Sequence, residues 1–108
     1  MFIVSSKYLV PRGFVGITIF PFIFLQKKTF KLNKVLINHE HIHLRQQLEL
    51  GIVFFFIWYA IEYVYRLIIF KDKRKAYRMI SFEREAYAFE NDMEYVLERK
   101  WYSFLKFV

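Results

Sequence analysis

The pattern of hydrophobic and polar positions changes along the chain, and the first pattern is typical of strands. Residues 2 to 10 and 14 to 25 are rich in β-branched and aromatic side chains, and the tripeptide Pro-Arg-Gly lies between them. This arrangement predicts a β-hairpin within residues 1–28. Pro21 cannot donate a hydrogen bond to a sheet, so we expect the second strand to lie at an edge or to carry a bulge there.

The second pattern favours helix. Residues 35–70 contain no strong helix breaker except Gly51, so we expect a helix before this glycine and a long apolar helix after it. The sequence Lys-Asp-Lys-Arg-Lys at 71–75 is expected to form a charged loop. Apolar residues at helical spacing predict a last helix over 76–100, and an aromatic tail, 101–108, follows it.

Length and composition add the fold class and exclude some chemistry. A chain of 108 residues suits one domain, and strands followed by helices indicate an α+β fold. An aromatic fraction of 22% exceeds what so small a core would hide, which indicates surface that faces lipid or a protein partner. The chain has no cysteine, so a metal ion could be held only by histidine and carboxylate.

The net charge of +7 would suit nucleic acid, an anionic lipid surface or an acidic protein. The basic residues are dispersed between apolar runs and form no recognised binding motif, which disfavours a nucleic-acid partner. The sequence therefore favours a membrane surface or a membrane protein as the partner.

The segment 51–70 is long and apolar enough to span a bilayer. Glu62 and Arg66 oppose insertion, but their i,i+4 spacing predicts an ion pair on one helix face. Two interpretations remain open: a buried helix of a soluble domain, and a membrane-embedded or interfacial helix with 71–75 against anionic headgroups. Peripheral attachment to the membrane is the compromise between them. Pro21 interrupts the N-terminal apolar run and no cleavage site follows, so we expect no cleavable signal peptide and a location at the cytoplasmic membrane.

All three histidines lie in one segment, His-Glu-His-Ile-His at 39–43, which contains the pattern His-Glu-x-x-His. Positions i and i+4 share a helix face, so His39 and His43 can bind one metal ion. Glu40 points about 100° away from His39, where it can reach a water on the metal rather than the metal itself. This spacing predicts a metal site with its own general base.

A zinc ion at this site needs a third protein ligand and an open position for water. With no further histidine, that ligand must be an aspartate or a glutamate. Glu83, Glu85 and Glu90 of the predicted last helix are the candidates, and the helical periodicity alone does not choose among them.

Two stretches resemble a known family. The segment His-Glu-His-Ile-His-Leu-Arg-Gln-Gln at 39–47 is similar to the active helix of small gluzincin-like domains, which read His-Glu-x-x-His-x-x-Gln-Gln. The segment Glu-Arg-Glu-Ala-Tyr at 83–87 is similar to their Glu-x-x-Ala ligand helix. The chain thus resembles a minimal gluzincin, a zinc metallopeptidase with an active helix and a glutamate-ligand helix in its core. In this chain we expect the long apolar helix to belong to the same helical core.

The resemblance implies a role for each motif residue. His39 and His43 would be zinc ligands, and Glu83 would be the third ligand because Ala86 lies three residues after it. Zinc would lower the pKa of its water and polarise the scissile carbonyl, while Glu40 as general base would pass the water's proton to the leaving amine. The expected substrate is a peptide or protein.

Three further residues are candidates for supporting roles. The family often has an aspartate where this chain has Tyr87, and Tyr87 or His41 could stabilise the oxyanion. Gln47 is a candidate partner of a ligand histidine. The resemblance also implies that the strand around residues 16–25 would hold an extended peptide by strand addition.

The leading hypothesis from sequence is a small, membrane-associated zinc metallopeptidase. The alternative is a non-catalytic accessory subunit of a membrane protein complex, with a degenerate or structural metal site. The aromatic surplus and the apolar run motivate the alternative.

Overall fold

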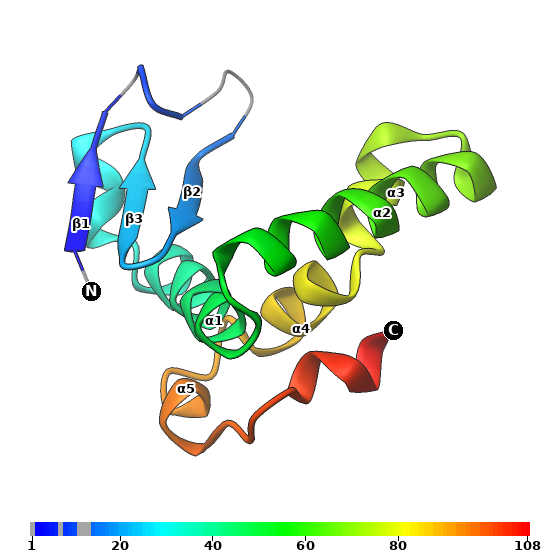
Figure 1. The fold of residues 1–108 in the computed structure, drawn as a ribbon. Coiled ribbons are helices and arrows are strands. Elements are labelled where there is room, and N and C mark those ends of the chain that lie inside the picture. Colours follow the sequence, from blue (N-terminus) through cyan, green and yellow to red (C-terminus); the bar gives the residue numbers. More distant parts are fainter. Residues whose placement is uncertain (1, 7, 11–13) are drawn as a thin grey trace.

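A computed structural model describes residues 2–6, 8–10 and 14–108, and it has the predicted α+β class (Figure 1). A small N-terminal sheet is followed by helices. In chain order the elements are β1 (Phe2–Ser5), β2 (Gly16–Ile19), β3 (Phe22–Leu25), the 3-10 helix η1 (Lys28–Leu32), α1 (Lys34–Leu50), α2 (Ile52–Phe70), α3 (Lys73–Arg78), α4 (Ser81–Phe89), α5 (Tyr95–Glu98) and the 3-10 helix η2 (Ser103–Phe107).

The sheet has the strand order β1-β3-β2, so β3 is its central strand. β1 pairs with β3 in parallel, with Phe2 opposite Phe22. β2 pairs with β3 in the antiparallel sense, with Gly16 opposite Leu25. β1 and β2 are therefore the two edge strands.

The predicted hairpin between residues 2–10 and 14–25 is wrong. The hairpin of the structure lies within 14–25, and the first strand joins it in parallel. Phe20 and Pro21 form the turn between β2 and β3, so Pro21 ends a strand and forms neither an edge position nor a bulge. A turn suits proline because no sheet hydrogen bond is required of its nitrogen. The predicted turn at 11–13 lies outside the described residues.

Helices on both sides of Gly51 were expected, and this prediction is confirmed. Gly51 has φ 81, a value that residues with a Cβ rarely adopt, and no atom outside its immediate neighbours lies within 4 Å of the position of an added Cβ. The side chain of Asn33 caps the start of α1 by accepting a hydrogen bond from the Leu36 nitrogen. Backbone chemistry at each end therefore sets the length of α1.

The single helix predicted over 76–100 is wrong, because α3, α4 and α5 occupy this range with two breaks. The first break precedes Ser81, whose backbone nitrogen and hydroxyl both donate to the Glu62 carboxylate from α2. Glu62 thus caps α4 from another helix. The predicted ion pair of Glu62 with Arg66 is also wrong, since no such pair forms between these two described residues.

Most of the predicted loop at 71–75 belongs to α3. Lys71 has φ 54 and ends α2, and the Asp72 side chain caps α3 by accepting hydrogen bonds from the Arg74 and Lys75 nitrogens. The capping aspartate therefore turns a charged stretch into the first turn of a short helix.

α1 is the central element of the fold, and it contacts β2, α2, α4 and α5. Figure 1 shows the sheet on one side of α1 and the remaining helices on the other. Separate apolar clusters fill these contacts. The first is Ile23, Leu25 and Leu44, the second is Phe55, Ile80, Phe82 and Phe104, and the third is Ile42, Ala86 and Val96.

Among the described residues, α2 is the one helix whose length and apolar composition would suffice to cross a membrane. Only 11% of its most apolar window is buried inside the protein. The core helix of a soluble protein or a signal sequence can satisfy the same two criteria, so they do not by themselves place α2 in a bilayer.

Candidate metal centre

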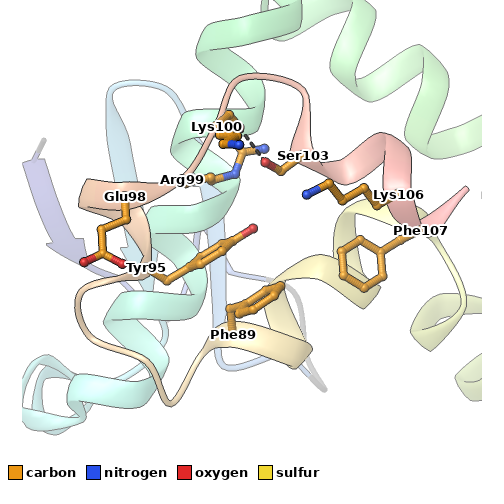
Figure 2. Close-up of a pocket in the computed structure, with 8 residues that line it drawn as sticks. All are labelled: Phe89, Tyr95, Glu98, Arg99, Lys100, Ser103, Lys106 and Phe107. Carbon is orange, nitrogen blue, oxygen red and sulfur yellow. Dashed lines mark hydrogen bonds between the residues drawn. The ribbon is translucent and has the colours of Figure 1, made fainter.

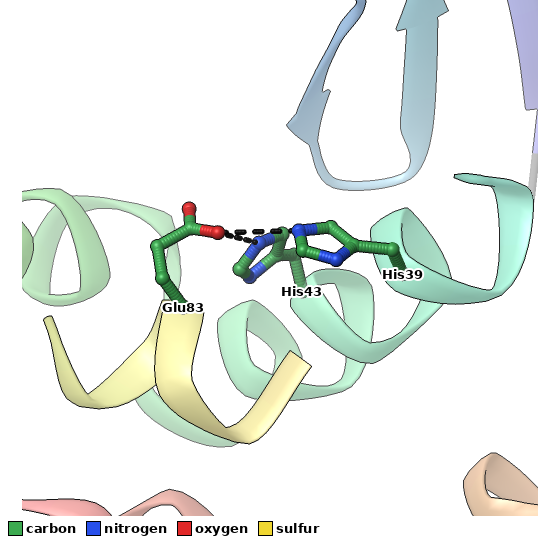
Figure 3. A group of neighbouring side chains, drawn as sticks. All are labelled: His39, His43 and Glu83. Carbon is green, nitrogen blue, oxygen red and sulfur yellow. Dashed lines mark hydrogen bonds and ion pairs between the residues drawn. The ribbon is translucent and has the colours of Figure 1, made fainter. Parts of the chain in front are cut away.

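The surroundings of α1 bury several of its polar residues, and two histidines are among them. His39 and His43 are each 5% exposed, lie one helical turn apart and face α4. Glu83 of α4 is 3% exposed and faces both rings (Figure 3). Each of these three residues offers one ligand atom, and the three atoms all lie within 4.8 Å of one another. The group could hold a metal ion.

The hydrogen bonds of Gln46 define the tautomer of His43. The Gln46 amide nitrogen donates to the Phe82 carbonyl at 3.1 Å and to Glu85 Oε1 at 3.0 Å. Its amide oxygen therefore faces His43 Nδ1, at 2.8 Å. Because that oxygen can only accept, Nδ1 must carry the proton. In neutral His43 the lone pair is consequently on Nε2.

His39 is oriented in the same way by a carboxylate. Its Nδ1 lies 2.8 Å from Glu90 Oε2, so Nδ1 is the donor and Nε2 carries the lone pair of the neutral ring. A carboxylate behind a histidine is the usual partner of a metal-bound imidazole. Glu90 thus holds the His39 ring from the side away from Glu83.

The Nε2 atoms of His39 and His43 each lie 3.2 Å from the same oxygen, Glu83 Oε1. Three atoms with lone pairs thus meet in a buried place, which is unfavourable unless a cation lies among them. Zinc bonds of 2.0–2.1 Å in a tetrahedron place neighbouring ligand atoms roughly 3.3 Å apart. The two distances to Glu83 Oε1 fit this spacing, and two imidazoles with a carboxylate are a known zinc donor set.

The structure separates the three glutamates that the sequence left open. Glu83 presents Oε1 to the histidines, while its Oε2 accepts a hydrogen bond from the Tyr59 hydroxyl of α2 at 2.7 Å. Glu85 faces the opposite side and pairs with Arg99. Glu90 contacts the far nitrogen of His39. Glu83 is therefore the glutamate in position to bind the ion.

The charges of the cluster act on one another. Burial lowers the pKa of His43, but the Glu83 carboxylate more than offsets this effect, and the pKa of His43 rises from 6.5 to about 9. Burial raises the pKa of Glu83, but His43 and His39 outweigh it and hold that pKa well below its usual range. In the metal-free protein the positive charge of the site is thus the protonated His43 ring. A metal ion would have to displace the proton from His43 Nε2.

This protonation predicts how the stability of the metal-free protein depends on pH. His43 has a folded pKa of about 9 and an unfolded value near 6.5. Its contribution to the free energy of unfolding is therefore fully present below pH 6.5 and is lost as the pH rises through 9. We expect a loss of about 3 kcal/mol over this window, at 1.36 kcal/mol per pKa unit.

Urea unfolding of chelator-treated protein at a series of pH values would measure this loss. The His43→Gln variant is the matched control, because it retains a polar side chain and lacks the titration. A wild-type curve that runs parallel to that of the variant from pH 6.5 to 9 would contradict the assignment of the proton to His43.

Glu40, the predicted general base, lies between α1 and the edge strand β2. Its side-chain Oε2 accepts a hydrogen bond of 2.6 Å from the Thr18 hydroxyl. The carboxylate also lies close to Gly16, where an added Cβ would be 3.3 Å from Oε1. Its charge contributes to the raised pKa of His43, so this carboxylate acts electrostatically on the cluster. Sequence reasoning did not identify Thr18 as its partner.

The three predicted supporting residues have different positions. The ring of Tyr87 packs against the His39 ring with centroids 4.5 Å apart. His41 is half-buried and lies outside the cluster of ligand atoms. Among the described residues, Gln47 forms no hydrogen bond with His39 or His43. Its amide nitrogen donates to the Thr18 carbonyl, and its amide oxygen accepts from the Phe20 nitrogen, both at 2.7 Å. Gln47 therefore holds β2 against α1.

A buried ion network behind His43 was missed by sequence reasoning. Arg99 donates to Glu85 Oε2 and to Glu49 Oε2, both at 2.6 Å, and these side chains are at most 1% exposed. Arg99 also lines a hollow between α5 and η2, whose lining residues are drawn in Figure 2. The volume of this hollow is about 220 Å³. Burial raises the pKa of Glu85, but the hydrogen bonds from Arg99 more than offset this and lower it. Because Glu85 also bonds to Gln46, the network supports the histidine ligand.

The signal that could have found Gln46 was its i,i+3 spacing from His43 on one helix. Arg99 carried no such signal, because it lies far along the chain from Glu49. The candidate metal centre therefore rests on the geometry of this structure alone. Comparison of the chain with protein-family models, with curated proteins and with solved structures found no match.

Proposed function

We propose that this chain is a zinc-dependent metallopeptidase-like protein that hydrolyses peptide bonds, with His39, His43 and Glu83 as zinc ligands and Glu40 as general base. The observation that carries the proposal is the convergence of two imidazole lone pairs and one carboxylate oxygen, each oriented by a second hydrogen bond. The gluzincin order of motifs along the chain supports the same function.

Each residue of the cluster has a separate task in this proposal. Zinc, when bound, would supply Lewis acidity that lowers the pKa of water and polarises a carbonyl group. The Glu40 carboxylate would accept a proton from the attacking water and deliver it to the leaving amine. The Thr18 hydroxyl would hold that carboxylate in one orientation through its 2.6 Å hydrogen bond.

The sheet supports a peptide as the proposed substrate. β2 is an edge strand beside α1, and an extended peptide can pair with such an edge through its backbone. The expected strand at 16–25 contributes only Gly16–Ile19 to this edge, because β3 is central. Thr18 belongs to β2 and contacts Glu40, so a peptide on this edge would lie beside the proposed base.

A non-catalytic metal site is the second candidate, and one observation favours it. The three ligands are at most 5% exposed, and closed sites are typical of structural zinc. In this alternative the chain would be an accessory subunit of a membrane protein complex, and the ion would join α1 to α4. Zinc binding without hydrolysis would separate this candidate from the first.

We also propose association with the cytoplasmic membrane. The support is α2, which is long and apolar enough to meet a bilayer and is mostly not covered by the rest of the protein. A membrane location would account for an aromatic fraction of 22% in so small a domain.

The Glu40→Gln variant tests the catalytic proposal. It removes the base and keeps a side chain that can still accept the Thr18 hydrogen bond. We expect full zinc content and a loss of cleavage of at least about 100-fold, the usual contribution of a general base. Elemental mass spectrometry would measure zinc, and a library of internally quenched fluorescent peptides would measure cleavage.

The matched control is Glu94→Gln, which makes the same change at an exposed position outside the cluster. It should leave zinc content and cleavage unchanged. Bound zinc with no cleavage by the wild type would favour the non-catalytic alternative. Cleavage that Glu40→Gln leaves intact would exclude Glu40 as the base.

A further inference from the structure

The outward face of α2 is apolar along its whole length. Every residue of α2 that is exposed is uncharged. Five of them, at spacings of three or four, form one stripe, which we call the α2 stripe: Val53, Ile57, Ile61, Val64 and Ile68, each between 50% and 69% exposed. The helix has 19 residues, so the face is roughly 28 Å long. A soluble monomer rarely exposes an apolar face of this extent.

The two charged residues of α2 point inward. Glu62 is 9% exposed and accepts hydrogen bonds from Ser81 of α4. Arg66 is half-buried, and its guanidinium lies 5.4 Å from the ring of Tyr65. The charges that argued against a membrane helix in the sequence therefore do not interrupt the exposed face.

The elements beside α2 oppose a transmembrane orientation. Figure 1 shows α3 beside the C-terminal half of α2. Lys75 of α3 lies with its Nζ 4.6 Å from the ring of Phe70. Lys73 and Arg74 are exposed on the same short helix. These cations lie near the end of α2, whereas two buried carboxylates lie beside its middle. Glu62 accepts hydrogen bonds from Ser81 of α4, and Glu83 of α4 accepts one from Tyr59. If α2 crossed a bilayer, these carboxylates would lie at the depth of the hydrocarbon, which strongly opposes insertion.

The same cations suit the headgroup region. Residues 71–78 carry one acid, Asp72, against a larger set of exposed bases: Lys71, Lys73, Arg74, Lys75 and Arg78. A basic cluster next to an apolar helix face is the composition that binds anionic lipid surfaces. At the other end, Tyr102 lines a hollow of about 560 Å³ that Ile57 and Ile61 of the stripe also line. Aromatic side chains with a polar group prefer the membrane interface.

From these observations we infer that α2 lies in the plane of an anionic bilayer surface, with the α2 stripe in the acyl boundary and the cations of residues 71–78 at the lipid phosphates. This inference rests on the membrane association proposed above and does not depend on zinc or on hydrolysis. It assigns a monotopic mode of binding, in which α4 and the metal centre lie on the side of α2 that faces away from the lipid.

Vesicle flotation tests the inference. We expect the wild type to bind vesicles of phosphatidylcholine mixed with phosphatidylglycerol at least about tenfold more tightly than vesicles of phosphatidylcholine alone, and high salt to reduce the difference. Ile61→Glu places a charge in the α2 stripe and should abolish binding. Leu97→Glu makes an equivalent change at a residue of α5 that is 86% exposed, and it should bind as the wild type does.

Depth measurements distinguish the in-plane orientation from a spanning one. The chain has no cysteine, so single cysteines at Val53, Ile61 and Ile68 can each carry one fluorophore. Val53 and Ile68 are roughly 22 Å apart along the helix axis. Equal, shallow quenching of all three probes by spin-labelled lipids supports the inference. Deep quenching at Ile61 with shallow quenching at both ends overturns it.

Two other outcomes would also overturn it. One is a wild type that forms a stable dimer in detergent-free buffer, as measured by sedimentation, and does not bind vesicles. If Ile61→Glu dissociates that dimer, the α2 stripe binds a second copy of the chain. The other is equal binding to neutral and anionic vesicles. Zinc content of Ile61→Glu should equal that of the wild type, so a failure of membrane binding is distinguishable from a failure of the metal centre.

Discussion

Replacing His43 by alanine is expected to remove zinc from the protein while the wild type retains about one ion per chain. Among the described residues, His43 supplies one of the three ligand atoms that converge, and its Nε2 lies 3.2 Å from Glu83 Oε1. Loss of one ligand of three should lower zinc affinity by more than about 100-fold, since changes in supporting residues alone cost 10- to 100-fold. Elemental mass spectrometry on protein purified without chelator or nickel would measure the content.

The control for this experiment is His41→Ala, two residues away on the same helix and outside the ligand cluster. It should retain the ion. Added zinc should also raise the thermal stability of the wild type and of His41→Ala, because an ion that binds only the folded state stabilises it by mass action. Equal zinc contents in His43→Ala and the wild type would refute the site.

The second large effect is expected from Arg99→Met. The Arg99 guanidinium is fully buried and donates to Glu85 at 2.6 and 3.0 Å and to Glu49 at 2.6 Å. Removal of the cation leaves two buried carboxylates without their partner, which typically costs 3–5 kcal/mol. Glu85 orients the amide of Gln46, so zinc affinity should also fall, by about tenfold. Urea unfolding and zinc titration would measure the two effects.

Lys100→Met is the matched control, because it makes the same change at the next residue, which is exposed. It should alter the free energy of unfolding by less than about 0.5 kcal/mol. Adding Glu85→Gln and Glu49→Gln to Arg99→Met should recover part of the lost stability, because neutral amides cost less to bury than unpaired carboxylates. An Arg99→Met variant as stable as the control would show that the network contributes nothing measurable.

The placement of His39 beside His43 could be predicted from sequence because it depends on local geometry. His39 and His43 are four residues apart, and any α-helix places such residues on one face. Glu83 could not be selected in this way, because helical periodicity did not distinguish it from Glu85 or Glu90. Only the packing of α4 against α1 separates them, and that packing depends on contacts 40 residues apart along the chain.

The failed predictions share one physical cause, which is a partner distant in sequence. Alternation identified strand-like residues but could not say that β1 would pair with β3 in parallel. No glycine or proline marks the end of α3, and the break before Ser81 is stabilised by Glu62 from α2. An ion pair of Glu62 with Arg66 was predicted because these two residues have i,i+4 spacing, and the sequence does not show that Ser81 is the partner.

The distance along the chain between His43 and Glu83 has a further consequence. A bound ion would cross-link α1 to α4 and close a loop of 40 residues that contains the whole of α2 and α3. Because the ion would bind only the folded state, it would stabilise by mass action the packing of α1 against α4, and with it the segment that joins the two ligands. A bound ion would therefore act as a removable cross-link, and its occupancy would help to determine whether α2 and α3 stay packed against the rest of the fold.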